Sequence, residues 1–216
     1  SLEMTTFDYG HFGVFPLAID EDAHNDGAVD WVGRSPQEVF DDIHGRVVEG
    51  AAPLVVANHP RAVPGLLGFF TSAAFDSATG QPGMPQFWSD DFDLIEVFND
   101  SSFDENSQLV TDWFGFLNRG RRIFAVGSSD THQVYDIPLG YPRTCARLGT
   151  DDTATLRGMG PAPLRDAMAG GHSVINGGVH LSALHASGAR PGEVVTNAAT
   201  SELVRVVVQA PQWVDV

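Results

Sequence analysis

Short apolar runs alternate along most of the chain with polar turns and with segments of helical periodicity. The runs at 53–58, 92–99 and 122–127 are mostly apolar, which is typical of strands buried on both faces of a parallel sheet. Apolar residues recur at helical spacing in 35–50, before the first of these runs, and in 104–118, between the second and the third. The alternation predicts an α/β fold with a parallel sheet or barrel.

The first of these helices carries its own start signal. Ser35 can cap the helix, Pro36 suits the first helical position, and Glu38 can reach back to the cap as a capping box. We expect Gly50 to end this helix and Gly120 to end the second one.

The two ends of the chain follow different patterns. Residues 2–17 predict two short strands around a turn, with Glu3 on the first strand and His11 between the two. A strand, a short helix and another strand are expected further on, at 141–148, 163–169 and 173–176. The last predicted strands, at 179–184 and 203–209, have no helix between them, which indicates the start of a small β module. We therefore divide the chain into a domain at 1–176 and a β extension at 177–216.

Composition limits the classes of partner. The 28 acidic residues outnumber the 12 basic ones and give a formal net charge of −16, which disfavours binding to nucleic acid or to an anionic membrane. An anionic substrate would need local positive charge, and bound metal ions could supply it. The single cysteine, Cys145, excludes an internal disulfide and is expected to be a buried thiol on a strand. No apolar run approaches the length of about twenty residues that a membrane span needs.

Potential metal ligands follow three of the predicted strands. His59 comes just after the first, Glu96 and Asn99 lie on the second, and Asp130 and His132 follow the third. The carboxyl ends of parallel strands in an α/β barrel share one face, so these side chains can converge there. A set of His, Asp and Glu without cysteine suits a hydrolytic centre of two or three metal ions, and Glu3 and His11 could join it.

Each candidate also has an ordinary interpretation. A histidine before proline can be a turn residue, an Asp-x-His can be a turn aspartate beside a surface histidine, and Glu96 can be a salt-bridged structural acid. The other histidines, namely His24, His44, His172, His180 and His185, are interpreted as surface or structural residues. A serine hydrolase that uses Ser128 or Ser129 with His132 is a further alternative, although no Gly-x-Ser-x-Gly motif supports it.

Several motifs, in this order, resemble the PHP (polymerase and histidinol phosphatase) family, in a branch similar to carbaryl hydrolase. They are Glu3-Met4-Thr5-Thr6, Gly10-His11-Phe12-Gly13-Val14-Phe15-Pro16-Leu17, Ala57-Asn58-His59-Pro60, Ile95-Glu96-Val97-Phe98-Asn99 and Gly127-Ser128-Ser129-Asp130-Thr131-His132. The resemblance covers residues 1–176 and implies a distorted TIM-like (β/α)7 barrel. It also implies up to three divalent ions of zinc, manganese or iron, and hydrolysis of a small phosphoester or a related ester such as a carbamate.

The resemblance assigns roles to individual residues. Glu3 would bridge two metal ions, with His11 and His59 on one of them, while Asp130 would bind another ion and His132 a third. Glu96 and Asn99 match a motif that faces the site, and we expect them among the catalytic residues. Arg143 could bind the substrate anion or form a structural salt bridge.

One departure from the family matters more than the matches. Family members begin with a His-x-His motif on the first strand, and this chain contains no such motif. We therefore expect the chain to be a fragment whose barrel is incomplete at the N-terminus, with two metal sites short of ligands and the Glu3, His11 and His59 site able to hold an ion. A non-catalytic binding or regulatory domain remains an alternative, and exposed strand edges predict self-association.

Overall fold

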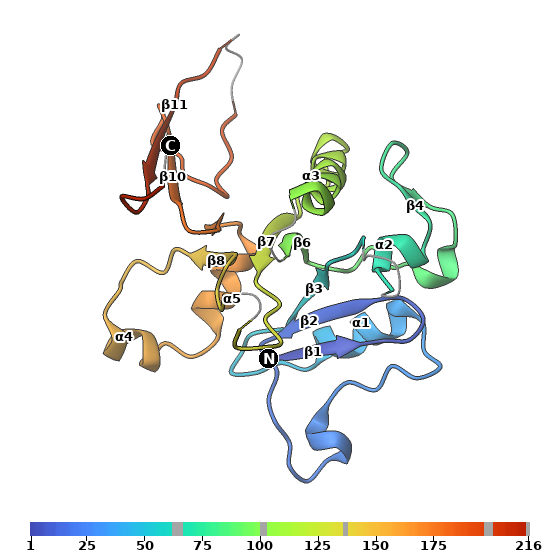
Figure 1. Cartoon of the computed structure of the whole chain (residues 1–216). Helices are drawn as coiled ribbons and strands as arrows, with labels where there is room; N and C mark the ends of the chain where they lie inside the picture. The colour runs from blue at the N-terminus through green and yellow to red at the C-terminus, as the bar shows by residue number, and fades with distance from the viewer. Residues whose placement is uncertain (62–66, 100–102, 136–137, 197–200, 215–216) are drawn as a thin grey trace.

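The centre of the protein is an open five-stranded sheet (Figure 1). The computed structural model describes residues 1–61, 67–99, 103–135, 138–196 and 201–214. The strands of the sheet, in their spatial order, are β1 (Leu2–Thr5), β2 (His11–Phe15), β3 (Leu54–Asn58), β6 (Leu94–Asn99) and β7 (Phe124–Ser128). The three predicted central strands and the two predicted N-terminal strands are all present, within two residues of their expected ends.

The predicted (β/α)7 barrel is wrong. The sheet is mixed, because β1, β2 and β3 pair antiparallel while β3, β6 and β7 pair parallel, and the described residues form no closed barrel. The cause is local, since the turn between β1 and β2 is far too short for the crossover that parallel neighbours require. β2 also runs antiparallel to β3, so only the pairs β3–β6 and β6–β7 have the parallel direction that a barrel needs.

Two longer helices pack against this sheet. α1 (Pro36–Gly45) contacts β3, and α3 (Phe103–Asn118) contacts β6. The capping box of α1 is confirmed, because the Ser35 side chain accepts from the Glu38 amide and the Glu38 carboxylate accepts from the Ser35 amide at 2.8 Å. The helix ends at Gly45 rather than at the expected Gly50. There the Arg46 guanidinium bonds back to Asp42 on the last turns of the helix.

Aromatic side chains form the core on one side of the sheet. A continuous cluster is formed by rings from β2, α1, α2 (Phe69–Ser72), β4 (Phe75–Asp76) and α3, and the centroids of neighbouring rings lie within 6.0 Å of each other. Phe69 and Phe70 at its centre are fully buried, and each such ring contributes about 1.5–3 kcal/mol by leaving water. This packing fixes the positions of β1, β2 and β3, whose opposite face carries the polar side chains described below.

The segment between α2 and β6 contains short regular structure. β4 pairs with β5 (Gln81–Pro82), and a single 3-10 turn, η2 (Pro85–Phe87), follows. A second 3-10 turn, η1 (His24–Gly27), lies in the acidic segment before α1. No long helix separates β3 from β6 among the described residues, in contrast to the regular alternation expected from the sequence.

The C-terminal part forms two further small sheets. β8 (Arg143–Ala146) pairs antiparallel with β9 (Ser173–Asn176), and the connection between them holds α4 (Thr153–Gly158) and α5 (Ala162–Ala169). β10 (His180–His185) pairs antiparallel with β11 (Val204–Gln209), and this hairpin extends away from the five-stranded sheet (Figure 1). The expected strands at both places are confirmed, whereas α4 was not predicted.

Outside the sheet, Cys145 differs from its sequence interpretation, and His44 proves to be structural, one of the two roles expected for it. Cys145 on β8 is only half-buried, and its sulfur accepts from the Asn176 amide at 3.0 Å. His44 is not a free surface residue, because its Nε2 lies 2.9 Å from the Asp93 carboxylate. In the described part of the chain, no helix combines the length and the apolarity needed to cross a bilayer.

Candidate metal centre

The β1–β2 hairpin brings Glu3 and His11 to one face of the sheet. Glu3 pairs with Gly13, and Thr5 pairs with His11, so the alternation of side chains places Glu3 and His11 on the same side. The intervening strand positions, Met4 and Phe12, are buried on the opposite side. An apolar–polar alternation thus separates the candidate ligands from the core within a single hairpin.

The hairpin turn depends on a glycine. Gly10 has a φ of +106°, and a Cβ atom at this position would lie 2.6 Å from the backbone nitrogen of Phe69. The Thr6 hydroxyl closes the same turn by donating to the Gly10 carbonyl at 2.7 Å. Only glycine fits both the left-handed backbone and the close approach of α2.

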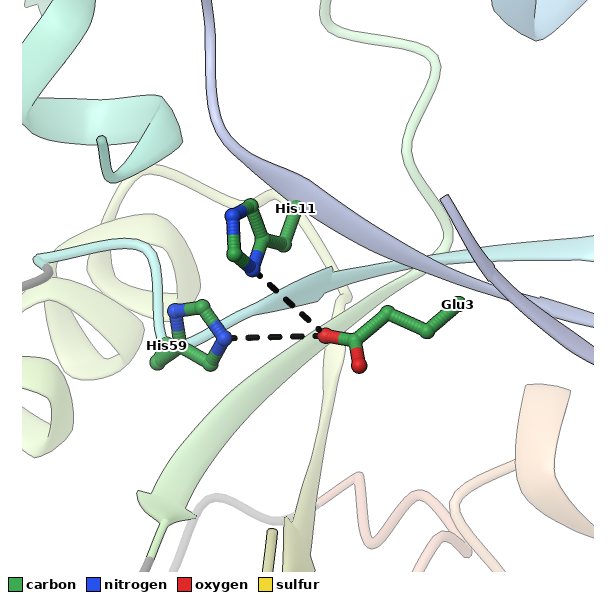
Figure 2. Close-up of side chains that lie close together, drawn as sticks. All are labelled: Glu3, His11 and His59. Carbon is green, nitrogen blue, oxygen red and sulfur yellow. Dashed lines mark ion pairs between the residues drawn. The ribbon is translucent and has the colours of Figure 1, made fainter. Parts of the chain in front are cut away.

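β3 supplies the third side chain. His11 pairs with Asn58, the last residue of β3, and His59 follows directly. The three side chains point toward one another, with Glu3 Oε1 3.7 Å from His11 Nδ1 and 3.6 Å from His59 Nε2 (Figure 2). The two imidazole rings meet edge to face, with their centroids 4.8 Å apart.

The amide of Asn58 completes the polar group around Glu3. Its Nδ2 donates to Glu3 Oε1 at 3.0 Å. Gly13, which lies between them on β2, leaves the space for this contact, because a Cβ there would come within 3.1 Å of Asn58 Oδ1. The sequence interpretation missed Asn58, although the alternation along β3 that follows from pairing with β2 would have placed it beside His11.

The electrostatics keep the carboxylate ionised. Interaction with the His59 imidazole, followed by the Asn58 hydrogen bond, lowers the pKa of Glu3 to about 2 in spite of partial burial. Burial lowers the pKa of His11, and the neighbouring His59 adds to the effect. Burial also acts to lower the pKa of His59, but Glu3, Glu96 and Asp130 outweigh it, so that the net shift is upward.

These three residues fit a divalent cation by their donor chemistry. One ligand atom from each of Glu3, His11 and His59 lies within 4.8 Å of the other two. Glu3 Oε1 lies 3.7 Å from His11 Nδ1 and 3.6 Å from His59 Nε2, and both distances are longer than a hydrogen bond. The carboxylate is therefore not bonded directly to either imidazole. His59 Nδ1 is buried and has no hydrogen-bond partner among the described residues, so they provide no second contact to orient this ring.

Asp130 and His132 lie outside this cluster. Asp130 follows β7 with a φ of +47°; its charge contributes to the raised pKa of His59 and opposes the lowering of the pKa of His11. His132 is 76% exposed and pairs with Asp130 at 3.1 Å. The structure therefore brings together three of the five predicted metal ligands, and Asp130 and His132 are not among them.

The predicted catalytic residues have different surroundings. Glu96 is 1% exposed, and its carboxylate accepts from the His59 amide, the Asn99 side chain and the Ser128 hydroxyl. No ion pair involves Glu96 among the described residues, so the expected salt bridge is absent there. Glu96 is also not one of the three residues of the metal cluster. Burial raises its pKa.

Arg143 and the two serines are also placed. Arg143 is exposed at the start of β8, donates to the Gly140 carbonyl at 3.3 Å, and has no carboxylate partner in the described ranges. Ser128 donates to Glu96, and Ser129 is buried and accepts from Thr131 and from the Gly140 amide. Within the described part of the chain, neither serine is hydrogen-bonded to a histidine, as the serine hydrolase alternative would require.

A separate hollow lies in the C-terminal part of the structure. It has a volume of about 630 Å³ and lies between the β8–β9 and β10–β11 pairs, where none of the predicted site residues lines it. The Glu3, His11 and His59 cluster is thus a group on the face of the sheet and is separate from this hollow.

Comparison of the chain with protein-family models, with curated proteins and with solved structures found no match.

Proposed function

We propose that the chain binds a divalent metal ion through Glu3, His11 and His59 and forms part of a metal-dependent hydrolase. The substrate would be a small phosphoester or a related ester such as a carbamate. The single observation that carries this proposal is the convergence of one carboxylate and two imidazoles from β1, β2 and the end of β3.

The donor set supports zinc, manganese or iron as the metal. Two imidazole nitrogens and one carboxylate oxygen are ligands that these ions share, and no thiolate is nearby to favour a purely structural zinc site. The low pKa of Glu3, about 2, keeps its oxygens available to a cation over the whole neutral range. The order of motifs that resembles the PHP family adds support from the sequence, whereas the open sheet adds none.

Each residue of the site would have its own role in binding and catalysis. Glu3, His11 and His59 would hold the ion, and Asn58 would hold the Glu3 carboxylate in place. When bound, the ion would polarise the scissile group and lower the pKa of a coordinated water. Asp130 would add its negative charge to the field at His11 and His59, and Arg143 has a guanidinium without a carboxylate partner among the described residues for the substrate anion.

Metal analysis tests the first part of the proposal. The purified chain should take up zinc, manganese or iron to about one ion per chain after dialysis, measured by plasma mass spectrometry. His59→Ala should lose this ion, and His24→Ala, which changes an exposed histidine in η1, should keep it. Equal metal content in all three proteins would refute the site.

Hydrolysis tests the second part. The loaded protein is assayed with p-nitrophenyl phosphate and with an aryl N-methylcarbamate, with and without a chelator. Activity that the chelator removes, and that His59→Ala lacks, supports a metal-dependent hydrolase. Activity that survives both supports the serine alternative.

A second candidate function is a metal-binding domain without catalysis. One observation favours it, namely that Asp130 and His132 pair with each other and His132 is mostly exposed, so that a second and third metal site are not assembled. Stoichiometric metal without hydrolysis of either ester would support this function.

A further inference from the structure

We propose that Glu96 is a positioning residue, whose buried carboxylate fixes the backbone of His59 and thereby aims the His59 imidazole at Glu3. The inference rests on the proposed function, because it assigns Glu96 a role in the affinity of the metal site. It differs from the catalytic role expected from the sequence, since Glu96 acts here through another residue.

The backbone of His59 needs external support. His59 has a φ of +26°, outside the favoured regions for a residue with a Cβ, at the point where the chain leaves β3. Such a strained conformation persists only where the surroundings hold it. The His59 amide donates to Glu96 Oε2 at 2.6 Å, and this contact is the side-chain support for the turn.

A carboxylate is well suited to hold this turn. Glu96 offers two acceptor oxygens, so one can accept from the His59 amide while the other accepts from the Ser128 hydroxyl. Fixing the amide of His59 also fixes the direction of its Cα–Cβ bond, and in this conformation Nε2 lies 3.6 Å from Glu3 Oε1.

Glu96 is itself held on both sides. Asn99 Nδ2 donates to the same oxygen at 3.1 Å, and the Ser128 hydroxyl on β7 donates to the other oxygen. The pairing of β6 with β7 shifts register between Glu96 and Phe98, and such bulges redirect side chains beside functional sites. The carboxylate therefore joins the carboxyl ends of β3, β6 and β7.

A purely structural role is the competing explanation, and three variants separate it from positioning. Ser128→Ala removes the link to β7 and leaves the contact with His59 intact. Glu96→Gln keeps an acceptor for the His59 amide, and its amide group can donate to the Ser128 oxygen. Glu96→Ala removes the support of His59 altogether.

The experiment is a titration of the folded chain with Zn²⁺ and with Mn²⁺ against a competing chelator dye. Circular dichroism and urea unfolding confirm the folded fraction of each variant. We expect Ser128→Ala and Glu96→Gln to bind within about tenfold of the wild type, and Glu96→Ala to bind about 10–100-fold more weakly, the range that supporting residues of metal sites show. Wild-type affinity in folded Glu96→Ala would overturn the proposal, and so would equal losses in Glu96→Ala and Ser128→Ala.

Two further measurements apply where Glu96→Ala does not fold. Glu96→Asp keeps the charge but draws the carboxylate back by one methylene, so it should weaken metal binding by a similar factor. In the wild type, the His59 amide should be protected from hydrogen exchange; rapid exchange of this amide contradicts the proposal. A wild type that binds neither ion refutes the metal site itself, whereas the amide measurement still judges the contact between Glu96 and His59.

Discussion

The Asn58 amide donates its 3.0 Å hydrogen bond to Glu3 Oε1, the same oxygen that faces His11 and His59. This shared oxygen makes Asn58 part of the site although it is not itself a ligand. It also ties the end of β3 to β1 across β2, over the space that Gly13 leaves open.

Asn58→Ala should weaken metal binding without unfolding the chain. The variant loses one hydrogen bond to an ionised acceptor, so we expect a loss of about 1.5–3 kcal/mol at most from the stability of the metal-free protein. Metal affinity should fall about tenfold, because Glu3 is then free to rotate away from the histidines. Dye competition and urea unfolding measure the two effects, with exposed Gln108→Ala on α3 as control. Unchanged affinity would remove Asn58 from the site.

Gly10→Ala should destabilise the β1–β2 hairpin. The new Cβ would stand 2.6 Å from the Phe69 nitrogen in a backbone with φ of +106°, so strain and overlap act together. We expect a loss of more than about 1 kcal/mol in urea unfolding.

Gly120→Ala is the matched control for this change. Gly120 also has a positive φ, of +82°, but a Cβ there meets nothing within 4 Å. This variant should show the backbone strain alone and therefore a smaller loss than Gly10→Ala. Equal losses would mean that the contact with Phe69 does not constrain the hairpin.

The pair of His44 and Asp93 predicts a pH-dependent part of the stability. The hydrogen bond to the Asp93 carboxylate, 2.9 Å away, raises the pKa of His44 above its unfolded value against the effect of burial, with Asp91 and Asp41 assisting. A raised pKa stabilises the fold below the unfolded value of about 6.5, and the stabilisation is lost as pH rises through the folded value. His44→Gln should therefore cost up to about 1 kcal/mol at pH 5.5 and less at pH 9.

Urea unfolding at both pH values measures this difference. His24→Gln, at an exposed position in η1, should change stability equally at the two pH values. A cost of His44→Gln that grows toward pH 9 would contradict the assignment.

Arg61→Met should be among the most destabilising single changes. Asp112 is 0% exposed, and Arg61 binds both of its oxygens, at 2.8 and 3.1 Å. Removing the arginine leaves a buried carboxylate with the Ser77 hydroxyl as its remaining partner among the described residues, at a cost of about 3–5 kcal/mol.

Removal of the charge should recover much of this loss. In the double variant Arg61→Met with Asp112→Asn, no ionised group remains buried at this place. The exposed Arg157→Met on α4 serves as control and should stay within about 0.5 kcal/mol of the wild type. Urea unfolding of the three variants decides, and failure of the double variant to recover would contradict this account.

The main helices and strands could be predicted because their signals are local in the sequence. The pairing of the strands depends on residues far apart in the sequence and could not be predicted. The start of α1 depends on Ser35 and Glu38, three residues apart, so its capping box was visible in the sequence. The strand at 54–58 was visible for the same reason, but nothing in its apolar run shows that it is antiparallel to β2 on one side and parallel to β6 on the other. The prediction of a barrel was wrong at this point, because the relative direction of two strands depends on how they pair and not on the sequence of either strand alone.

The candidate site also combines contacts that the sequence predicts with contacts that it does not. Alternation along the hairpin explains why Glu3 and His11 meet, whereas the contact between the His59 amide and Glu96 depends on a positive φ and a β-bulge that no residue type reveals. The sequence showed that Glu96 needs a partner. It could not show that the partners are three uncharged donors rather than an arginine or a metal ion.

β1 is the edge strand of the five-stranded sheet, paired on one side only, and it carries Glu3. Edge strands open at lower free energy than central ones. Detachment of β1 from β2 would remove one ligand in three, so fraying of this strand and release of the ion would be a single event. A bound ion would in turn clamp β1 onto β2 and β3, and protection of the β1 amides against hydrogen exchange would rise with metal concentration.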